Sequence, residues 1–260
     1  MAKANWTKFP HPDQAYRYDG ARLKQHWDRL HRGDCEPFPK RDALQAAWRL
    51  YHAGDFEQAA LAGLGLGVDG HSVANKATAI YATYLERSGP KRTRLLAAAM
   101  ARGEAAIQAK PKDPNAHYFY ALAAGRYSQE ISVVKALAHG LGGKVKGALG
   151  RAIALQPKHA DAHIALGAWH AEIINKVGAM VGGLTYGAKK EAALEHFGAA
   201  LKLNPDSAIA RLEYANALAM LFGKDRLQEA EQLYAAAAKL KAMDAMERLD
   251  VEAAKRELED

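Results

Sequence analysis

The chain has 260 residues, of which 49% are hydrophobic and 25% charged, and its formal net charge is +7. A chain of this length and composition buries enough apolar surface to fold without disulfides or structural metals. Cys35 is the single cysteine, which excludes an intramolecular disulfide framework and favours a reducing compartment. Residues 1–10 lack the apolar core of a secretory signal, and no segment approaches the roughly 18 apolar residues of a membrane span, so we expect a soluble cytoplasmic protein.

Residues 1–41 are rich in aromatic and basic side chains, and a helix is expected over 22–31 with Trp27 and Leu30 on one face. Aromatic rings between basic residues can bind nucleic acid by stacking and phosphate contact. A terminal repeat needs an atypical cover, however, so we favour a capping segment and do not expect a nucleic-acid partner. The basic excess is not gathered into one block, which favours ordinary solubility charge and leaves a partner with an acidic surface as the alternative.

The clearest helical hairpin begins near Asp42. Gly54 is expected to end its first helix in the left-handed conformation, and Asp55 is expected to cap the second. Two further helices are expected over 72–87 and 91–109, divided by a Ser-Gly-Pro sequence.

Three later segments end alike, each as an amphipathic helix stopped just before Pro111, Pro157 or Pro205. After each proline the chain restarts with a helix that carries a large residue followed by a small one, as a close helix crossing requires. These pairs are Tyr120-Ala121, Leu166-Gly167 and Tyr214-Ala215. A last hairpin turns at Gly223. The recurrence predicts an all-α solenoid of about five antiparallel hairpins over 42–242, followed by a C-terminal helix over 243–260.

The proline-to-proline spacings are 157 − 111 = 46 and 205 − 157 = 48 residues. Tetratricopeptide repeats (TPRs) have a period of about 34 residues, so two adjacent repeats carry insertions between their helices. The insertions cover 125–144 and 172–190, and each runs from an overlong helix through a glycine-rich apolar turn to a pair of lysines.

The large-small pairs, the endings before proline and the Gly-Asp-Phe-Glu-Gln-Ala turn at 54–59 resemble the TPR family. Over 105–242, the long first helices with insertions resemble the TPR domain of the regulator of microtubule dynamics family. That resemblance implies interaction with microtubules, membrane-contact partners or lipids. The sequence shows no membrane anchor of the kind that several eukaryotic members carry, so a microtubule role is not carried over.

A curved stack of hairpins exposes its first helices along a concave groove, and helical spacing then selects the residues that face it. The insertions add lysines beside this groove. The expected binding residues are Asn115, Tyr118, Leu122, Arg126, Lys144, Asp161, Ile164, Ala168, Glu172, Lys189, Lys190, Leu212 and Asn216.

The leading hypothesis is a non-enzymatic scaffold or adaptor that binds a protein or peptide through this groove and the two insertions. The alternative is a carrier of a lipid or small apolar ligand with the same groove as its pocket. Self-association through an open end of the stack is a third possibility. In a different arrangement, the insertions fold back and fill the groove, because an apolar glycine-rich turn is unfavourable in water.

Three weaker patterns are set aside, and we expect neither cofactor nor metal. His159, His163 and His170 have metal-ligand chemistry but lack a closed ligand set. The G-x-G-x-x-G sequence at 65–70 follows a helix rather than a strand, so it predicts a loop and not a phosphate site. No nucleophile-base or paired-carboxylate arrangement has an interpretable spacing, which argues against an enzyme.

Overall fold

The computed structural model describes residues 6–259, and every regular element in that range is helical. Short helical turns occur at Gln14–Tyr16, Gly67–Gly70, Gly182–Tyr186 (a π-helical turn) and Gly223–Arg226. The α-helices are α1 Arg22–Leu30, α2 Asp42–His52, α3 Phe56–Gly65, α4 His71–Tyr84, α5 Gly89–Ala109, α6 Pro114–Glu130, α7 Val133–Ala138, α8 Leu141–Leu155, α9 Ala160–Val177, α10 Ala179–Val181, α11 Lys190–Leu203, α12 Ala208–Phe222, α13 Leu227–Ala238 and α14 Ala245–Arg256.

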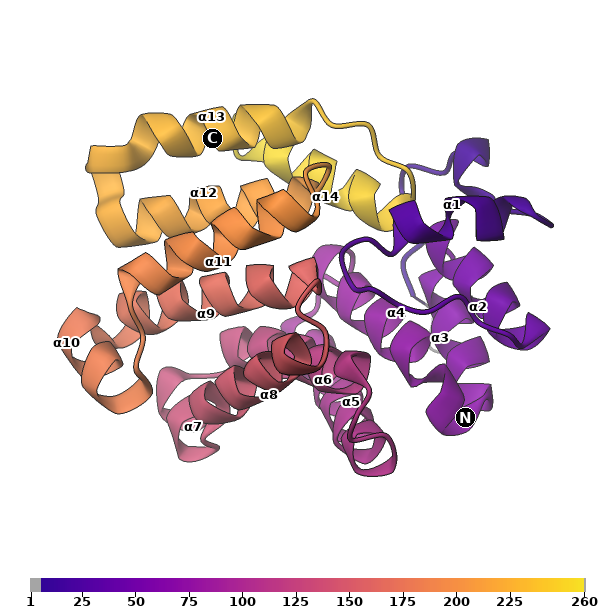
Figure 1. Ribbon diagram of the computed structural model, residues 1–260, viewed down its shortest axis with the longest axis horizontal. Coiled ribbons are helices and arrows are strands. Elements are labelled where there is room, and N and C mark those ends of the chain that lie inside the picture. The colour runs from indigo at the N-terminus through magenta and orange to yellow at the C-terminus, as the bar shows by residue number, and fades with distance from the viewer. Residues whose placement is uncertain (1–5, 260) are drawn as a thin grey trace.

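These helices pack as five antiparallel hairpins within the described residues: α2 with α3, α4 with α5, α6 with α8, α9 with α11, and α12 with α13 (Figure 1). Neighbouring hairpins stack in chain order, and α14 packs against α12 and α13. The all-α, TPR-like solenoid predicted from the sequence is confirmed. None of the helices in residues 6–259 is long and apolar enough to cross a membrane.

The repeated prolines mark helix ends as predicted. Helices α5, α8 and α11 end at Ala109, Leu155 and Leu203, two residues before each proline. Each following helix begins with a side-chain cap that accepts a backbone N–H, which satisfies one of the unpaired donors at a helix start. The capping residues are Asp113, His159 and Ser207.

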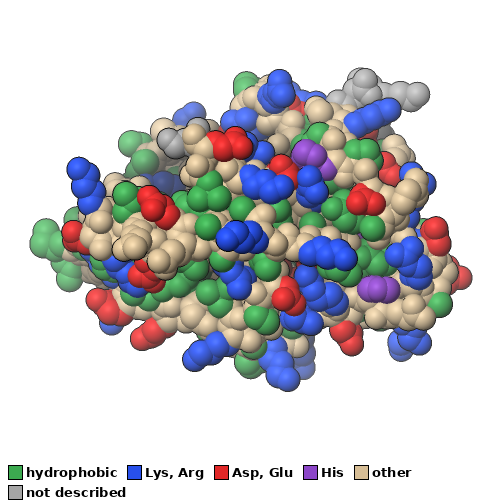
Figure 2. All heavy atoms as spheres, turned by 90° about the horizontal axis from the view of Figure 1, so that it is seen from above, with side chains coloured by type: hydrophobic (Ala, Val, Ile, Leu, Met, Phe, Trp, Pro, Cys, Tyr) green, Lys and Arg blue, Asp and Glu red, His purple; other side chains and the backbone are tan. Residues whose placement is uncertain are grey.

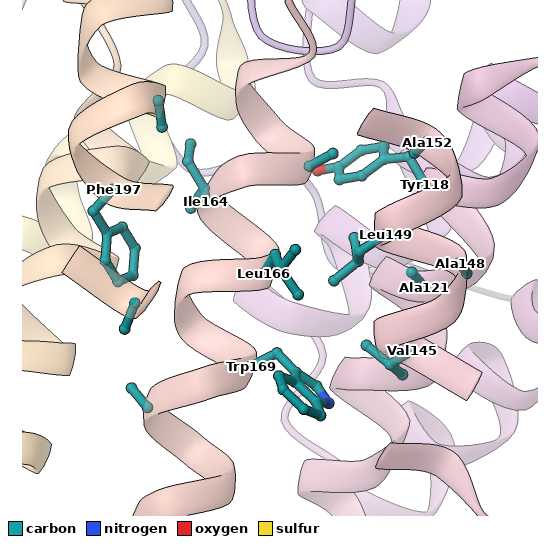
Figure 3. Packing of buried hydrophobic residues seen from close by; sticks show 14 of the residues in the cluster. Tyr118, Ala121, Val145, Ala148, Leu149, Ala152, Ile164, Leu166, Trp169 and Phe197 are labelled. Atoms are coloured by element: carbon teal, nitrogen blue, oxygen red, sulfur yellow. The ribbon is translucent and has the colours of Figure 1, made fainter. Parts of the chain in front are cut away.

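Small residues stand where helices cross closely, as the large-small pairs predict. A Cβ atom on Gly167 of α9 would lie 2.9 Å from the Phe197 ring of α11, so only glycine allows this approach. Figure 3 shows Phe197 on one side of α9 and Leu149 of α8 on the other. The α9 helix is thus the centre of the main hydrophobic core.

The turn of the first hairpin is partly as expected. Gly54 has φ +87°, and a Cβ atom there would collide with the Phe9 ring, so glycine is required for both reasons. The prediction that Asp55 caps α3 is wrong, because its side chain makes no capping hydrogen bond.

The aromatic residues of the N-terminal segment pack inward. Tyr18 and Trp27 are buried in one cluster with Trp48 of α2 and Leu249 of α14, and the Tyr18 hydroxyl donates to the Met243 carbonyl at 2.7 Å. Rings held in this way cannot stack on bases. On the face seen in Figure 2, Lys and Arg side chains are dispersed among acidic ones, so the positive charge forms no single patch there.

Candidate functional site

A groove lies between the parallel first helices α6 and α9 and contains a cavity of about 170 Å³. Its remaining walls come from α4, α7, the start of α8, α12 and α14. An apolar cavity of roughly 150 Å³ is large enough for a benzene molecule, so this one can hold an alkyl segment or one apolar side chain. The main apolar lining residues are Ala79, Ile80, Tyr118, Ala121, Leu122, Val133, Ala136, Leu137, Leu141, Val145, Leu149, Ile164, Ala165, Ala168, Trp169, Ile173, Val177, Tyr186, Ile209 and Met246.

The groove follows the helix axes. Its lining on α9 runs from Asp161 to Val177, which at 1.5 Å per residue corresponds to about 24 Å. One end contains Lys76 and Asp161, and the other lies beside α7 and Tyr186. The site is therefore long and narrow rather than round.

The insertions form the sides of the groove at the end beside α7 and Tyr186, and they leave the cavity open. Val133, Ala136 and Leu137 of α7 line one side, and Tyr186 lines another. The indole N–H of Trp169 donates to the carbonyl of Gly142 at 2.9 Å, which ties α9 to the start of α8. The second insertion packs on the first, because the Tyr186 ring lies 3.0 Å from where a Cβ of Gly142 would be, and the Lys146 ammonium of α8 donates to the Tyr186 carbonyl at 2.7 Å. The arrangement is intermediate between an open groove and a filled one.

Most polar side chains in the groove are already paired with one another. Arg126 donates to Glu213 at 2.8 Å, and the Tyr84 hydroxyl donates to Asp250 at 2.5 Å. The side chain of Gln129 likewise donates to Glu172. Burial raises the pKa of Asp250 well above its ordinary value. The groove therefore offers a ligand few free donors and acceptors.

The polar end of the groove is built on a buried ion pair. The Lys76 ammonium lies 2.5 Å from the Asp34 carboxylate, and His31 lies 2.9 Å from another oxygen of Asp34. Asp161 has no hydrogen bond or ion pair through its carboxylate among the described residues, and burial raises its pKa to about 7 although Lys76 opposes this. The segment containing Asp34 thus closes the groove from the N-terminal side.

A hydrogen-bonded chain continues behind this end. The His159 ring bonds to the side-chain amide oxygen of Asn115 at 2.9 Å, and the side-chain amide nitrogen of Asn115 donates to the Glu36 carboxylate at 2.6 Å. Burial lowers the pKa of His159 to about 4, so this ring is neutral at pH 7. Burial, with the charges of Asp34 and Asp113, raises the pKa of Glu36 to about 8.

The raised pKa of Glu36 predicts a pH-dependent stability. Between about pH 4.5 and about pH 8 the folded chain holds a proton on Glu36 that the unfolded chain releases, so stability falls as pH rises through that window. The Glu36→Gln variant resembles the protonated form and should not lose this contribution. We expect the thermal midpoint of Glu36→Gln, minus that of the parent chain, to be larger at about pH 9 than at about pH 6. The same difference in thermal midpoint at both pH values would contradict a raised pKa for Glu36.

The structure brings together most of the binding residues predicted on the first helices. All of the predicted residues that line the groove belong to α6 and α9. They are Tyr118, Leu122, Arg126, Asp161, Ile164, Ala168 and Glu172.

The other predicted residues lie outside the groove. Asn115 is 1% exposed, and its side chain bonds to His159 and Glu36 behind the polar end of the groove. Leu212 packs against α14, and Asn216 accepts a hydrogen bond from Tyr234 of α13. Lys190 donates to the Leu221 carbonyl, while Lys144 and Lys189 are exposed on the insertions.

Two groove residues on α12 were not predicted. Ile209 and Glu213 face the groove in place of Leu212 and Asn216, a difference of three residues along the helix. Counted back from the large-small pair of each repeat, Ile209 stands at the same position as Asp161 of α9, which also lines the groove. Alignment of the two repeats could therefore have found this register.

Two further groove residues carry no signal in the sequence. Lys76 and Asp250 come from α4 and α14, outside the two elongated repeats. No repeat position or helical spacing marks either of them, so only the packing of these helices around the groove reveals their place.

The patterns set aside have structural explanations. Among residues 6–259 no group of three or more His, Cys, Asp or Glu is arranged to hold a metal ion. His163 instead pairs with His196 at 2.9 Å between ring nitrogens. In the glycine-rich stretch, a Cβ on Gly70 would lie 2.1 Å from the Gly63 carbonyl oxygen, so Gly70 allows α3 and α4 to approach.

Comparison with known proteins agrees with the fold. A search of curated protein sequences found no match. Among solved structures, the chain is similar to a thermophilic TPR protein of Thermus thermophilus, with a TM-score of 0.58 and 16% identity over 83% of this chain and 98% of that one. The model of the "Regulator of microtubule dynamics protein 1-3" family matches residues 69–260, which include both insertions and the whole groove-forming part of α4, α6 and α9. The chain therefore belongs to the regulator of microtubule dynamics protein 1-3 family.

Proposed function

We propose that this protein is a non-enzymatic binding protein whose groove holds the apolar chain of a lipid or similar small ligand. The observation that carries the proposal is the lining: apolar side chains on α6, α7 and α9 surround a narrow cavity, and most of the polar side chains between them are paired with one another. An alkyl chain brings no hydrogen-bonding groups into the groove, so it leaves these pairs intact and removes apolar surface from water.

A peptide fits this groove less well. An extended peptide would bring backbone N–H and C=O groups into a site where they find few partners, and unpaired buried polar groups are unfavourable. A helical peptide satisfies its own backbone but is about 10–12 Å across, and even one turn of about 5.4 Å at that width has more volume than the cavity of about 170 Å³. A TPR-type array is nevertheless a scaffold that commonly binds proteins, so a protein partner elsewhere on this surface is compatible with the proposal.

The test uses glycine positions that differ only in whether they face the groove. Gly125 lies on the groove wall, and a Cβ there meets no atom within 4 Å. Gly125→Phe should therefore fill the groove without disturbing the fold. Gly150 on α8 is exposed, lies outside the groove and has equally open space around it, so Gly150→Phe is the matched control.

We expect a fluorescent long-chain fatty acid to bind the parent chain and Gly150→Phe equally, and to bind Gly125→Phe at least about tenfold more weakly, which is about 1.4 kcal/mol. The measurement is a fluorescence titration with circular dichroism to verify folding. Equal binding to all three chains, or no saturable binding to any, would contradict the proposal. Binding of the probe only after a protein partner is added would favour the adaptor hypothesis instead.

A further inference from the structure

The outer faces of the two insertions carry most of the exposed apolar side chains. Among the described residues, six of the eleven large hydrophobic residues exposed to solvent lie in α7, α10 and the turn after α10. The most exposed are Leu184 at 83%, and Met180 and Val134, each at 76%. We call the two segments 131–139 and 178–187 the tips. Exposed apolar side chains gathered in this way mark an interaction surface.

The tips lie at the same end of the molecule. Tyr186 of the second tip contacts Gly142, just after the first tip, and its carbonyl accepts a hydrogen bond from Lys146. In Figure 1 both α7 and α10 lie toward the left end, away from the N-terminal helices. Figure 2, turned about the same horizontal axis, shows hydrophobic atoms protruding at that end.

The charge around the tips is of one sign. Residues 131–150 contain three lysines and residues 173–190 contain three more, and neither range contains an aspartate or glutamate. Lys135, Lys144 and Lys189 make no hydrogen bond or ion pair through their side chains among the described residues, whereas Lys176 pairs with Glu172. The tips therefore combine protruding apolar groups with positive charge that nothing in the tips neutralises.

This combination matches an anionic bilayer better than a protein surface. An apolar helix face can enter the boundary between lipid headgroups and acyl chains by about 5–10 Å, while lysines beside it attract anionic headgroups. Two narrow protrusions present little of the continuous, complementary area that a stable protein interface needs. A bilayer surface adapts to separate protrusions and requires no such complementarity.

We propose that the two tips insert together into the interfacial region of a membrane that contains anionic lipids. Val134 enters from one tip, and Met180, Val181 and Leu184 enter from the other. Lys135, Lys144 and Lys189 lie at the headgroup level. This docking goes beyond the ligand proposed for the groove and does not depend on it, because only the outer faces of the insertions take part.

The test is sedimentation of the full chain with vesicles of phosphatidylcholine alone or mixed with phosphatidylserine. The tip variant is Val134→Ser/Met180→Ser/Val181→Ser/Leu184→Ser, in which none of the four residues lines the groove. The matched control, Leu61→Ser/Leu64→Ser/Val68→Ser/Leu227→Ser, changes four exposed hydrophobic residues outside the tips. Thermal unfolding of both variants verifies that these surface changes leave the fold intact.

We expect the parent chain and the control to bind mixed vesicles, with weaker binding at high salt, and the tip variant to bind at least about tenfold more weakly. Each of Lys135→Gln, Lys144→Gln and Lys189→Gln should reduce binding about fivefold at low salt. Gly125→Phe should bind vesicles normally, which separates this proposal from that for the groove. No binding of the parent chain, equal loss in the tip and control variants, or self-association that the tip variant abolishes without any vesicle binding would overturn it.

Discussion

Replacing Asp34 with alanine is expected to lower the free energy of unfolding by about 3–5 kcal/mol, because it leaves the Lys76 ammonium buried without its counter-charge. Lys76 is 3% exposed and lies 2.5 Å from the Asp34 carboxylate. The same carboxylate also bonds His31, whose pKa burial lowers to about 4. No other acidic side chain forms an ion pair with Lys76 in the described residues, and the Asp161 carboxylate at the same end of the groove acts on Lys76 without contacting it.

The control for this prediction is a double variant. Asp34→Ala/Lys76→Met removes both charges and leaves an apolar side chain of similar length, so we expect it to be more stable than Asp34→Ala alone. Asp28→Ala, at an exposed position on α1, should change stability by no more than about 0.5 kcal/mol. Chemical denaturation followed by circular dichroism measures all three. A loss below about 1 kcal/mol for Asp34→Ala would show that the buried pair does not support this end of the groove.

The second large effect is expected at Phe197. This ring is 0% exposed, stacks on Tyr214 with ring centroids 5.1 Å apart, and lies against Gly167 of α9. Phe197→Ala should lower the free energy of unfolding by about 3–5 kcal/mol, because it removes a buried ring and leaves a cavity at the α9–α11 crossing. The same denaturation measurement applies.

Two further variants separate packing from a general effect of substitution. Phe197→Leu keeps part of the apolar volume and should lose less than half as much stability as Phe197→Ala. Leu64→Ala, at a residue that is 45% exposed, should lose little. If Phe197→Leu and Phe197→Ala were equally destabilised, ring packing against Gly167 would not explain the crossing.

The repeat architecture could be predicted from the sequence because its signals are local. A proline ends a helix wherever it stands, and a small residue beside a large one allows a close crossing, so Pro157 and Gly167 carry the same meaning in the sequence as in the fold. The groove residues Tyr118 and Ile164 followed from helical spacing for the same reason.

The rest depends on contacts between distant parts of the chain. Lys76 and Asp250 meet the groove only because α4 and α14 pack around it, and neither helix shows a pattern that reveals this. Leu212 was expected in the groove but packs against α14, because the C-terminal helix covers that face of α12. The helical spacing of apolar residues also could not determine whether α7 fills the groove or forms one of its sides. Both arrangements bury part of Val133 and Leu137.

The binding of an apolar chain in the groove can be measured by native mass spectrometry of the full protein, purified and then incubated with a long-chain fatty acid. We expect one bound molecule per chain for the parent protein and for Gly150→Phe, released on denaturation, and none for Gly125→Phe. The bare chain mass for the parent protein, before and after incubation, would contradict a groove built to hold an apolar chain.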